Sequence, residues 1–177
     1  MVYSGQETGE PAQGAEGFGG DDARTTIFDY WSMPNLTPWV NDHKYDGAKL
    51  NKKQKDLRSF YARLLRLCAE PAFTKGEFYG LNHANQGNEQ YGRTANEKAS
   101  GHWIYSFLRH DKESGQAFLV VVNLHPTETL NNVHVQLPED AIKWLGWKSD
   151  TLSFTDRLGS AVAAKSNKKD LPEAGLP

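Results

Sequence analysis

The stretch between residues 24 and 41 holds the side chains best suited to chemistry. Three aromatic residues stand there among groups that form directional hydrogen bonds: Tyr30, Trp31 and Trp39 beside Arg24, Asp29, Asn35 and Asn41. Because a sugar offers an apolar ring face and a rim of hydroxyls, its binding sites combine flat aromatic rings with planar hydrogen-bonding groups. The composition is therefore compatible with contact with carbohydrate, but it favours this interpretation less than the alternative. The alternative is that the rings simply anchor a long loop.

The glycine-rich segment 5–20 could instead indicate a loop that cradles phosphate through its backbone amides. Such a loop needs a lysine, or at least no negative charge nearby. This one is surrounded by carboxylates: Glu7, Glu10, Glu16, Asp21 and Asp22. Their repulsion disfavours phosphate, so we do not expect a nucleotide cofactor here.

The sequence also lacks the usual motifs of metal sites and of nucleophilic catalysis. The six histidines have no partner four residues away, and no His-Glu-x-x-His or Gly-x-Ser-x-Gly motif occurs. Asp21 and Asp22 are adjacent, whereas glycosidic acid/base chemistry needs two carboxyl groups that face each other. Cys68 lies on an apolar helical stripe, where a core position is the expectation. We therefore expect no metal and no cofactor.

Length and charge narrow the class of protein. The chain has 177 residues, with 20 basic and 22 acidic side chains, a net charge of −2 and a pI near 6.3. This balance gives no basic footprint for nucleic acid, and no run of eighteen apolar residues predicts a membrane span. The first residues have no basic and apolar leader pattern, so no secretory signal peptide is expected in this chain.

The clearest predicted element is a helix from Lys52 to Ala69. Its apolar residues recur at three- and four-residue spacing, which indicates one hydrophobic face: Leu57, Phe60, Tyr61, Leu64, Leu67 and Cys68. Asn51 is the expected N-cap, and Pro71 is the expected stop.

The rest of the chain predicts β-structure. Five short runs are rich in aromatic or β-branched residues: Glu77–Leu81, Trp103–Arg109, Ala117–Leu124, Asn131–Leu137 and Thr151–Phe154. Residues 110–116 predict a hairpin connection, and residues 138–145 a short helical turn. The Asn-rich segment 82–100 predicts a mobile loop, and the tail from Lys165 onward predicts no closing strand.

Several of these motifs, in this order, resemble the alpha-amylase family (glycoside hydrolase family 13). Tyr3, Gly5 and Glu7, followed by Gly9, resemble the end of the last conserved block, Gly-x-Pro-x-x-Tyr-x-Gly-x-Glu, on the eighth strand of the family's TIM barrel. The run from Arg24 to Trp31 resembles the loop after that strand, and the predicted helix resembles the eighth barrel helix. The two runs Trp103–Arg109 and 118–124 are similar to the first hairpin of the family's C-terminal β-domain.

The resemblance implies an α+β fragment of a larger fold. Residues 1–70 would be a remnant of the (β/α)8 barrel, comprising its last strand, a long loop and its last helix. Residues 71–177 would be the C-terminal antiparallel β-sandwich domain, without its last strand. The family's three catalytic carboxylates lie on earlier barrel strands, so the resemblance places every bond-breaking residue upstream of residue 1.

The function implied by the resemblance is that of a retaining glycoside hydrolase or transglycosylase acting on α-glucosidic bonds of starch-like α-glucans. This chain alone would be inactive. It would contribute side chains to the binding of an α-glucan or maltooligosaccharide: Gln6, Glu7, Arg24, Asp29, Tyr30 and Trp31. The alternative is a non-catalytic carbohydrate-binding β-sandwich module with a helical appendage.

The apolar helix face leads to one expectation about partners. Side chains that would pack inside a whole barrel have no such cover in this chain, and burying each of them contributes about 1.5–3 kcal/mol. We therefore expect the face formed by Leu57, Phe60 and Leu64 to be covered, either by the chain's own β-domain or by the same face of a second copy. A homodimer is the favoured outcome.

Overall fold

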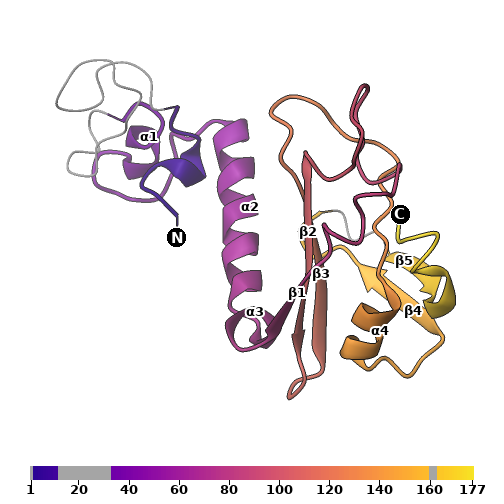
Figure 1. Ribbon diagram of the computed structural model, residues 1–177. Helices are drawn as coiled ribbons and strands as arrows, with labels where there is room; N and C mark the ends of the chain where they lie inside the picture. The colour runs from indigo at the N-terminus through magenta and orange to yellow at the C-terminus, as the bar shows by residue number, and fades with distance from the viewer. Residues whose placement is uncertain (1, 12–32, 160–162) are drawn as a thin grey trace. The chain divides into compact units, whose positions relative to one another are not determined.

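The computed structural model describes residues 2–11, 33–159 and 163–177 (Figure 1). It divides into two compact units, Met1–Arg66 and Leu67–Pro177, and each is described by itself.

Unit 1 is built from short helices and turns. It contains the 3-10 helix η1 (Gln6–Thr8), α1 (Thr37–Val40) and most of α2 (Lys52–Cys68). Its buried apolar side chains come from the segment around α1: Met33, Leu36, Val40 and Leu50. The last barrel strand that the resemblance implies is not observed in residues 2–11, because Val2 and Tyr3 belong to no strand and the amide of Gln6 closes a turn on the Tyr3 carbonyl (3.1 Å). A strand needs a paired neighbour, which the described residues of unit 1 do not offer. The barrel remnant is therefore not confirmed.

Helix α2 confirms the predicted helix to within one residue, and Asn51 caps it. The Gln54 amide donates to Asn51 Oδ1 (3.0 Å), and the Asn51 amide donates to Gln54 Oε1 (2.9 Å), so the two residues form a reciprocal capping box. The only buried residue of α2 is Gln54. The predicted apolar face is half-buried or exposed, with Phe60 37% exposed. Cys68 is exposed, so its predicted place in a core is wrong.

Unit 2 is antiparallel, as predicted. Strands β1 (Glu77–Gly80), β2 (Ile104–Asp111) and β3 (Gln116–Asn123) form a three-stranded sheet in the order β1-β2-β3. The predicted hairpin joins β2 to β3, with Asp111 opposite Gln116. Strands β4 (Thr151–Thr155) and β5 (Ala163–Asn167) form a second, two-stranded sheet. The short helices are α3 (Pro71–Thr74), α4 (Glu139–Leu145), which confirms the predicted helical turn, and η3 (Lys168–Asp170).

The core of unit 2 lies on one face of the three-stranded sheet. Alternate residues of β2 are buried there, among them Ile104, Ser106 and Leu108. Helix α4 and the β4–β5 pair lie on this side of the sheet (Figure 1), and the helix contributes Ala141 and Leu145 to the same apolar cluster. The layer opposite the sheet therefore combines a helix with a short strand pair, and the predicted β-sandwich is not confirmed.

Two predictions for the end of unit 2 are wrong. Residues 131–137 form no strand, because their backbone partners come from several segments: the amides of His134, Val135, Gln136 and Leu137 donate to Gln90, Leu176, Asn85 and Leu171. The tail does belong to the fold. It supplies most of β5, it buries Leu171 and Leu176 in the core, and Leu176 exchanges two backbone hydrogen bonds with Val135 (2.8 and 2.9 Å).

The segment 82–100, predicted to be mobile, is held by a buried polar network. Asn85 is fully buried; its amide nitrogen donates to the carbonyls of Leu81 and Gln136, and its Oδ1 accepts the Gln136 amide (2.8 Å). The Tyr91 ring is also fully buried, and its hydroxyl is hydrogen-bonded to Ser106. Asparagine here replaces backbone hydrogen bonds that a strand or helix would make, so a Gly/Asn-rich composition does not indicate mobility.

Candidate carbohydrate-binding site

Gln6 and Glu7, which the family resemblance implies to bind substrate, lie on η1 between two glycines in left-handed conformation. Gly5 (φ 82°) and Gly9 (φ 74°) flank the short helix. A Cβ at Gly5 would lie 2.6 Å from Met33 Cε and 2.9 Å from the Glu10 Cβ, so both the backbone angle and the available space require glycine there. The turn therefore fixes the directions in which Gln6 and Glu7 leave the backbone.

These two side chains make different contacts. Gln6 Oε1 accepts the amide of Tyr3 (3.1 Å), so the side chain stabilises its own turn. Glu7 Oε1 accepts from Arg58 Nη1 of α2 at 3.3 Å. The guanidinium carbon of Arg58 in turn lies 4.6 Å from the centre of the Trp39 ring, a cation–π contact. The geometry thus joins Glu7, Arg58 and Trp39 in one cluster.

The cluster continues to a second aromatic residue. The rings of Trp39 and Tyr45 have centroids 5.8 Å apart at an angle of 58°, and the Tyr45 and His43 rings are 6.3 Å apart. We call Glu7, Arg58, Trp39, Tyr45 and His43 the Glu7–Tyr45 ladder. It offers aromatic surface beside a carboxylate, a guanidinium and an imidazole, which is the combination that a sugar requires.

Glu10 supports the ladder by tying η1 to the approach to α1. Its Oε2 accepts the amides of Asn35 (2.9 Å) and Leu36 (3.2 Å), and Asn35 Nδ2 donates to the Gly9 carbonyl (2.7 Å). Gln54 Nε2 then donates to Asn35 Oδ1 (3.2 Å) and links this network to the start of α2. The polar side chains of three segments therefore hold η1, the approach to α1 and α2 together.

The Tyr45 loop, residues 41–47, has an unusual backbone. Asn41, Asp42, His43 and Tyr45 have φ values of 46°, 52°, 66° and 54°. The left-handed conformation costs an ordinary residue about 1–2 kcal/mol. Gly47 (φ 67°) closes the loop in a place where a Cβ would lie 3.2 Å from Trp39 Cδ1.

Hydrogen bonds within the loop offset this cost. Asn41 Nδ2 and the Ala48 amide both donate to Asp46 Oδ1, at 2.7 and 3.0 Å. These two bonds, the one from the Ala48 amide first, lower the pKa of Asp46. The amides of Tyr45 and Gly47 donate to the carbonyls of Val40 (3.0 Å) and Trp39 (3.1 Å). The loop is thus held in one conformation.

The sequence indicates only half of this arrangement. It singles out Glu7 and Trp39, but it does not assign Arg58, Glu10 or Tyr45 to the site. Four further residues predicted to bind substrate, Arg24, Asp29, Tyr30 and Trp31, lie outside the described residues. Arg58 stands off the apolar stripe of its helix and resembles a solvated cation, and no local pattern marks Tyr45.

The pKa values of several described carboxyl groups bear on a role as catalytic acid. A general acid for glycosidic cleavage needs a raised pKa. Six described carboxyl groups have a pKa below the usual range because they accept hydrogen bonds: Asp42, Asp46, Glu77, Glu97, Asp111 and Asp156. The described segments also contain no group of three or more histidine, cysteine or acidic side chains that could hold a metal ion.

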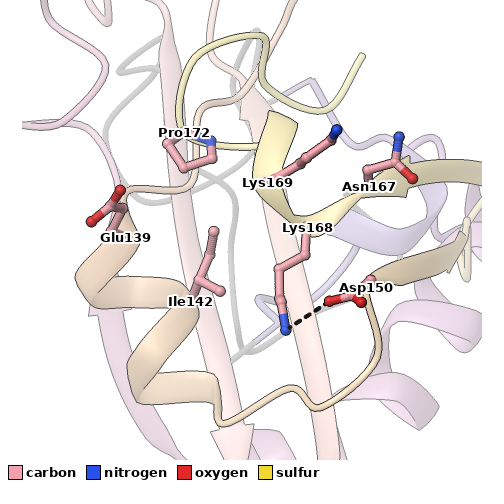
Figure 2. A pocket seen from close by; sticks show the side chains of 7 residues that line it. All are labelled: Glu139, Ile142, Asp150, Asn167, Lys168, Lys169 and Pro172. Carbon is pink, nitrogen blue, oxygen red and sulfur yellow. Dashed lines mark ion pairs between the residues drawn. The ribbon is translucent and has the colours of Figure 1, made fainter.

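Unit 2 contains a separate pocket of about 530 Å³ beside α4 and η3 (Figure 2). Its lining is polar with two apolar side chains: Glu139, Ile142, Asp150, Asn167, Lys168, Lys169 and Pro172. Lys168 already pairs with Asp150 (3.6 Å) and donates to the Trp147 carbonyl (3.1 Å). Since no aromatic ring lines this pocket, the ladder in unit 1 is the better candidate for a sugar.

No helix among the described residues is long and apolar enough to cross a membrane.

Comparison with known proteins gives one match. Residues 95–169 match the family model described as "Alpha amylase, C-terminal all-beta domain", a range that includes β2 through β5. Neither the curated proteins nor the solved structures contain a significant match to the chain. The antiparallel strands of unit 2 agree with the all-β description, and the matched residues include the hairpin from which the resemblance is drawn. Residues 95–169 of the chain are therefore similar to the C-terminal all-β domain of alpha amylase.

Proposed function

We propose that this chain is the C-terminal portion of a retaining glycoside hydrolase or transglycosylase that acts on α-glucosidic bonds of starch-like α-glucans. The observation that carries the proposal is the match of residues 95–169 to the C-terminal all-β domain of alpha amylase. The order of the other motifs supports it, since the segment that resembles the last barrel strand precedes the helix and the β-domain, as in that family.

Retaining cleavage needs two carboxyl groups about 5–5.5 Å apart, one acting as nucleophile and one as acid and base. Among the described residues, the side-chain contact of the Glu7 carboxylate is with the Arg58 guanidinium and not with a second carboxyl group. The six described carboxyl groups with a lowered pKa are also unsuited to act as the acid. We therefore assign the catalytic carboxylates to barrel strands that would precede this sequence, as the resemblance implies.

The role assigned to unit 1 is to shape the sugar-binding face. Active sites of TIM barrels lie at the carboxyl ends of the strands and in the loops that follow them. On this proposal, Gln6 and Glu7, which lie on η1, take the place of the family motif at the end of the eighth strand, and Arg24, Asp29, Tyr30 and Trp31 belong to the loop after it. The pairing of Glu7 with Arg58, and the stacking of Arg58 on Trp39, support a rigid polar and aromatic edge at that place.

The first test is an activity assay on the purified chain with maltooligosaccharides and nitrophenyl α-glucosides. We expect no turnover, because the bond-breaking groups lie elsewhere, together with weak retention in affinity electrophoresis through soluble starch. Turnover that survives repurification and disappears in the Glu7→Gln variant would contradict the proposal.

A second test separates the enzyme from the alternative, a non-catalytic binding module. In the enzyme, the reading frame upstream of Met1 continues with a Gly-x-Pro triplet and earlier barrel motifs. A stop codon and a ribosome-binding site directly before Met1 would instead favour the module.

A further inference from the structure

Tyr45 presents an aromatic ring that the fold does not use for its own core. The residue is 52% exposed, although it sits in a left-handed backbone conformation (φ 54°) that an aromatic residue rarely adopts. Strained positions of this kind persist when the surrounding structure holds them, and they gather at binding sites. The strain of the Tyr45 loop is not compensated by burial of the tyrosine side chain.

The loop is held from both sides, so the ring has a defined place. The Tyr45 amide donates to the Val40 carbonyl, and the Asp46 carboxylate binds Asn41 Nδ2 and the Ala48 amide on the other side of the turn. The Trp39 ring lies against Tyr45 at 5.8 Å between centroids. A preorganised ring loses little conformational freedom when a ligand covers it.

The charges around the ring point to a neutral ligand. Three acidic and three basic side chains belong to the ladder or the segment around the loop: Glu7, Asp42 and Asp46 with Lys44, Lys49 and Arg58. Two of the cations are already paired with two of the anions, Lys49 with Asp42 (2.6 Å) and Arg58 with Glu7 (3.3 Å). Among these described side chains the charges balance, three against three, which favours a neutral polyhydroxylated ring that stacks on the aromatic platform and uses the hydrogen-bonding groups beside it.

We propose that Tyr45 is an outer sugar platform, which stacks on one hexose ring of an α-glucan chain at the far end of the Glu7–Tyr45 ladder. This inference rests on the proposed function, because it extends the same sugar-binding edge. Glu7 stands at one end of the ladder and Tyr45 towards the other, joined through Arg58 and Trp39. Only a glucan long enough to reach past the inner residues touches Tyr45, so affinity rises with chain length.

The experiment measures binding of maltose, maltotetraose and maltoheptaose to the full chain by titration calorimetry, with starch affinity electrophoresis as a second readout. The test variant is Tyr45→Asn, because asparagine tolerates the left-handed backbone and lacks the ring. We expect it to lower the affinity for maltoheptaose about five- to tenfold, as loss of one stacked ring would, and to remove most of the gain with chain length.

Two further variants control the result. Tyr45→Phe keeps the ring and should bind within about twofold of the unmutated chain, since stacking on the ring needs no hydroxyl. Tyr105→Asn removes a comparably exposed ring from unit 2 and should leave binding unchanged. Thermal unfolding of each variant verifies that the fold is retained.

The outcomes separate this inference from the proposed function. If the unmutated chain binds glucans and Tyr45→Asn keeps the full gain with chain length, the platform is wrong while the glucan-binding edge stands. Equal losses in Tyr45→Asn and Tyr45→Phe would also overturn stacking, because the hydroxyl would then be the binding group. If the unmutated chain binds no glucan of any length, the proposed edge itself fails, and the platform fails with it.

Discussion

Tyr79 on β1 donates a hydrogen bond to Asp140 on α4 at 2.6 Å. Burial first, and then this hydrogen bond and the charge of Asp140, raise the pKa of the Tyr79 hydroxyl to about 12. The neighbouring Trp144 Nε1 donates to Glu77 Oε2 (3.0 Å), so two hydrogen bonds join the first strand to the helix. At the scale of single residues, the attachment of α4 therefore depends on a proton held by Tyr79.

The sign of the resulting pH dependence follows from the raised pKa. A tyrosine in the unfolded chain has a pKa near 10, so folding favours the protonated hydroxyl. Its contribution to stability is complete below about pH 10 and is lost as the pH rises through about 12. We expect the urea midpoint of the unmutated chain to exceed that of Tyr79→Phe at pH 8, and the difference to shrink towards pH 12. A difference between the unmutated chain and Tyr79→Phe that stays constant from pH 8 to pH 12 would contradict the assignment.

The sequence identifies some residues of the candidate site and not others. Glu7 stands out because of its place in a family-like motif, and Trp39 because it is a tryptophan in a polar stretch. Arg58 and Tyr45 join them only through the fold: Arg58 by its position on α2, and Tyr45 by four left-handed residues in and around one turn. No rule of local propensity predicts a run of left-handed non-glycine residues, so this half of the ladder could not be read from the sequence.

At the scale of elements, the sequence predicts those that rest on local chemistry. Helix α2 has both an apolar period and a capping box, and the β2–β3 hairpin has a polar turn that ends in Gly115. The strand predicted for residues 131–137 is wrong, because alternation of apolar and polar side chains arises in any extended segment that lies on a core, whether or not it pairs as a strand. Strand β5 (Ala163–Asn167) escapes prediction, since it contains no β-branched or aromatic residue.

The half-exposed apolar face of α2 leads to the element-scale prediction. The homodimer expected through Leu57, Phe60 and Leu64 stays a prediction, and a two-fold pairing of this face would be self-complementary. We expect the unmutated chain to scatter light as a dimer in the micromolar range and Leu64→Glu to be monomeric, because the carboxylate would be buried without a partner. Ser59→Glu adds the same charge at an exposed position away from this face and should remain dimeric. A monomeric unmutated chain would reject the dimer.

At the scale of the whole molecule, the last residues of the chain complete the hydrophobic core of unit 2. Leu171 is fully buried, Leu176 is 9% exposed, and both belong to the cluster that contains Leu81 and Leu108. The core therefore includes part of the tail in which the sequence predicts no closing strand. Its few apolar residues are scattered among charged and proline residues, and their partners lie far away along the chain.

Removal of residues 171–177 should destabilise unit 2 severely. Burial of each leucine contributes about 1.5–3 kcal/mol, so the two together account for about 3–6 kcal/mol of the roughly 5–15 kcal/mol that stabilise a typical domain. Urea unfolding followed by tryptophan fluorescence should show a large fall in the midpoint, because Trp144 and Trp147 pack against this core. Removal of Pro177 alone, which is exposed, should leave the midpoint unchanged. An equal midpoint for both truncations would exclude the tail from the core.

The backbone bridge between Val135 and Leu176 also determines when this unit can fold in a cell. A ribosome delivers the chain from its N-terminus at about 5–20 residues per second, so roughly 3–10 seconds separate the synthesis of Asn123, the last residue of β3, from that of Leu176. During this interval β1, β2 and β3 already exist, with the strongly apolar run from Phe118 to Val122 uncovered. Unit 2 therefore cannot complete its core until its last residues have been synthesised. The exposed apolar surface makes the nascent chain prone to aggregation during this interval.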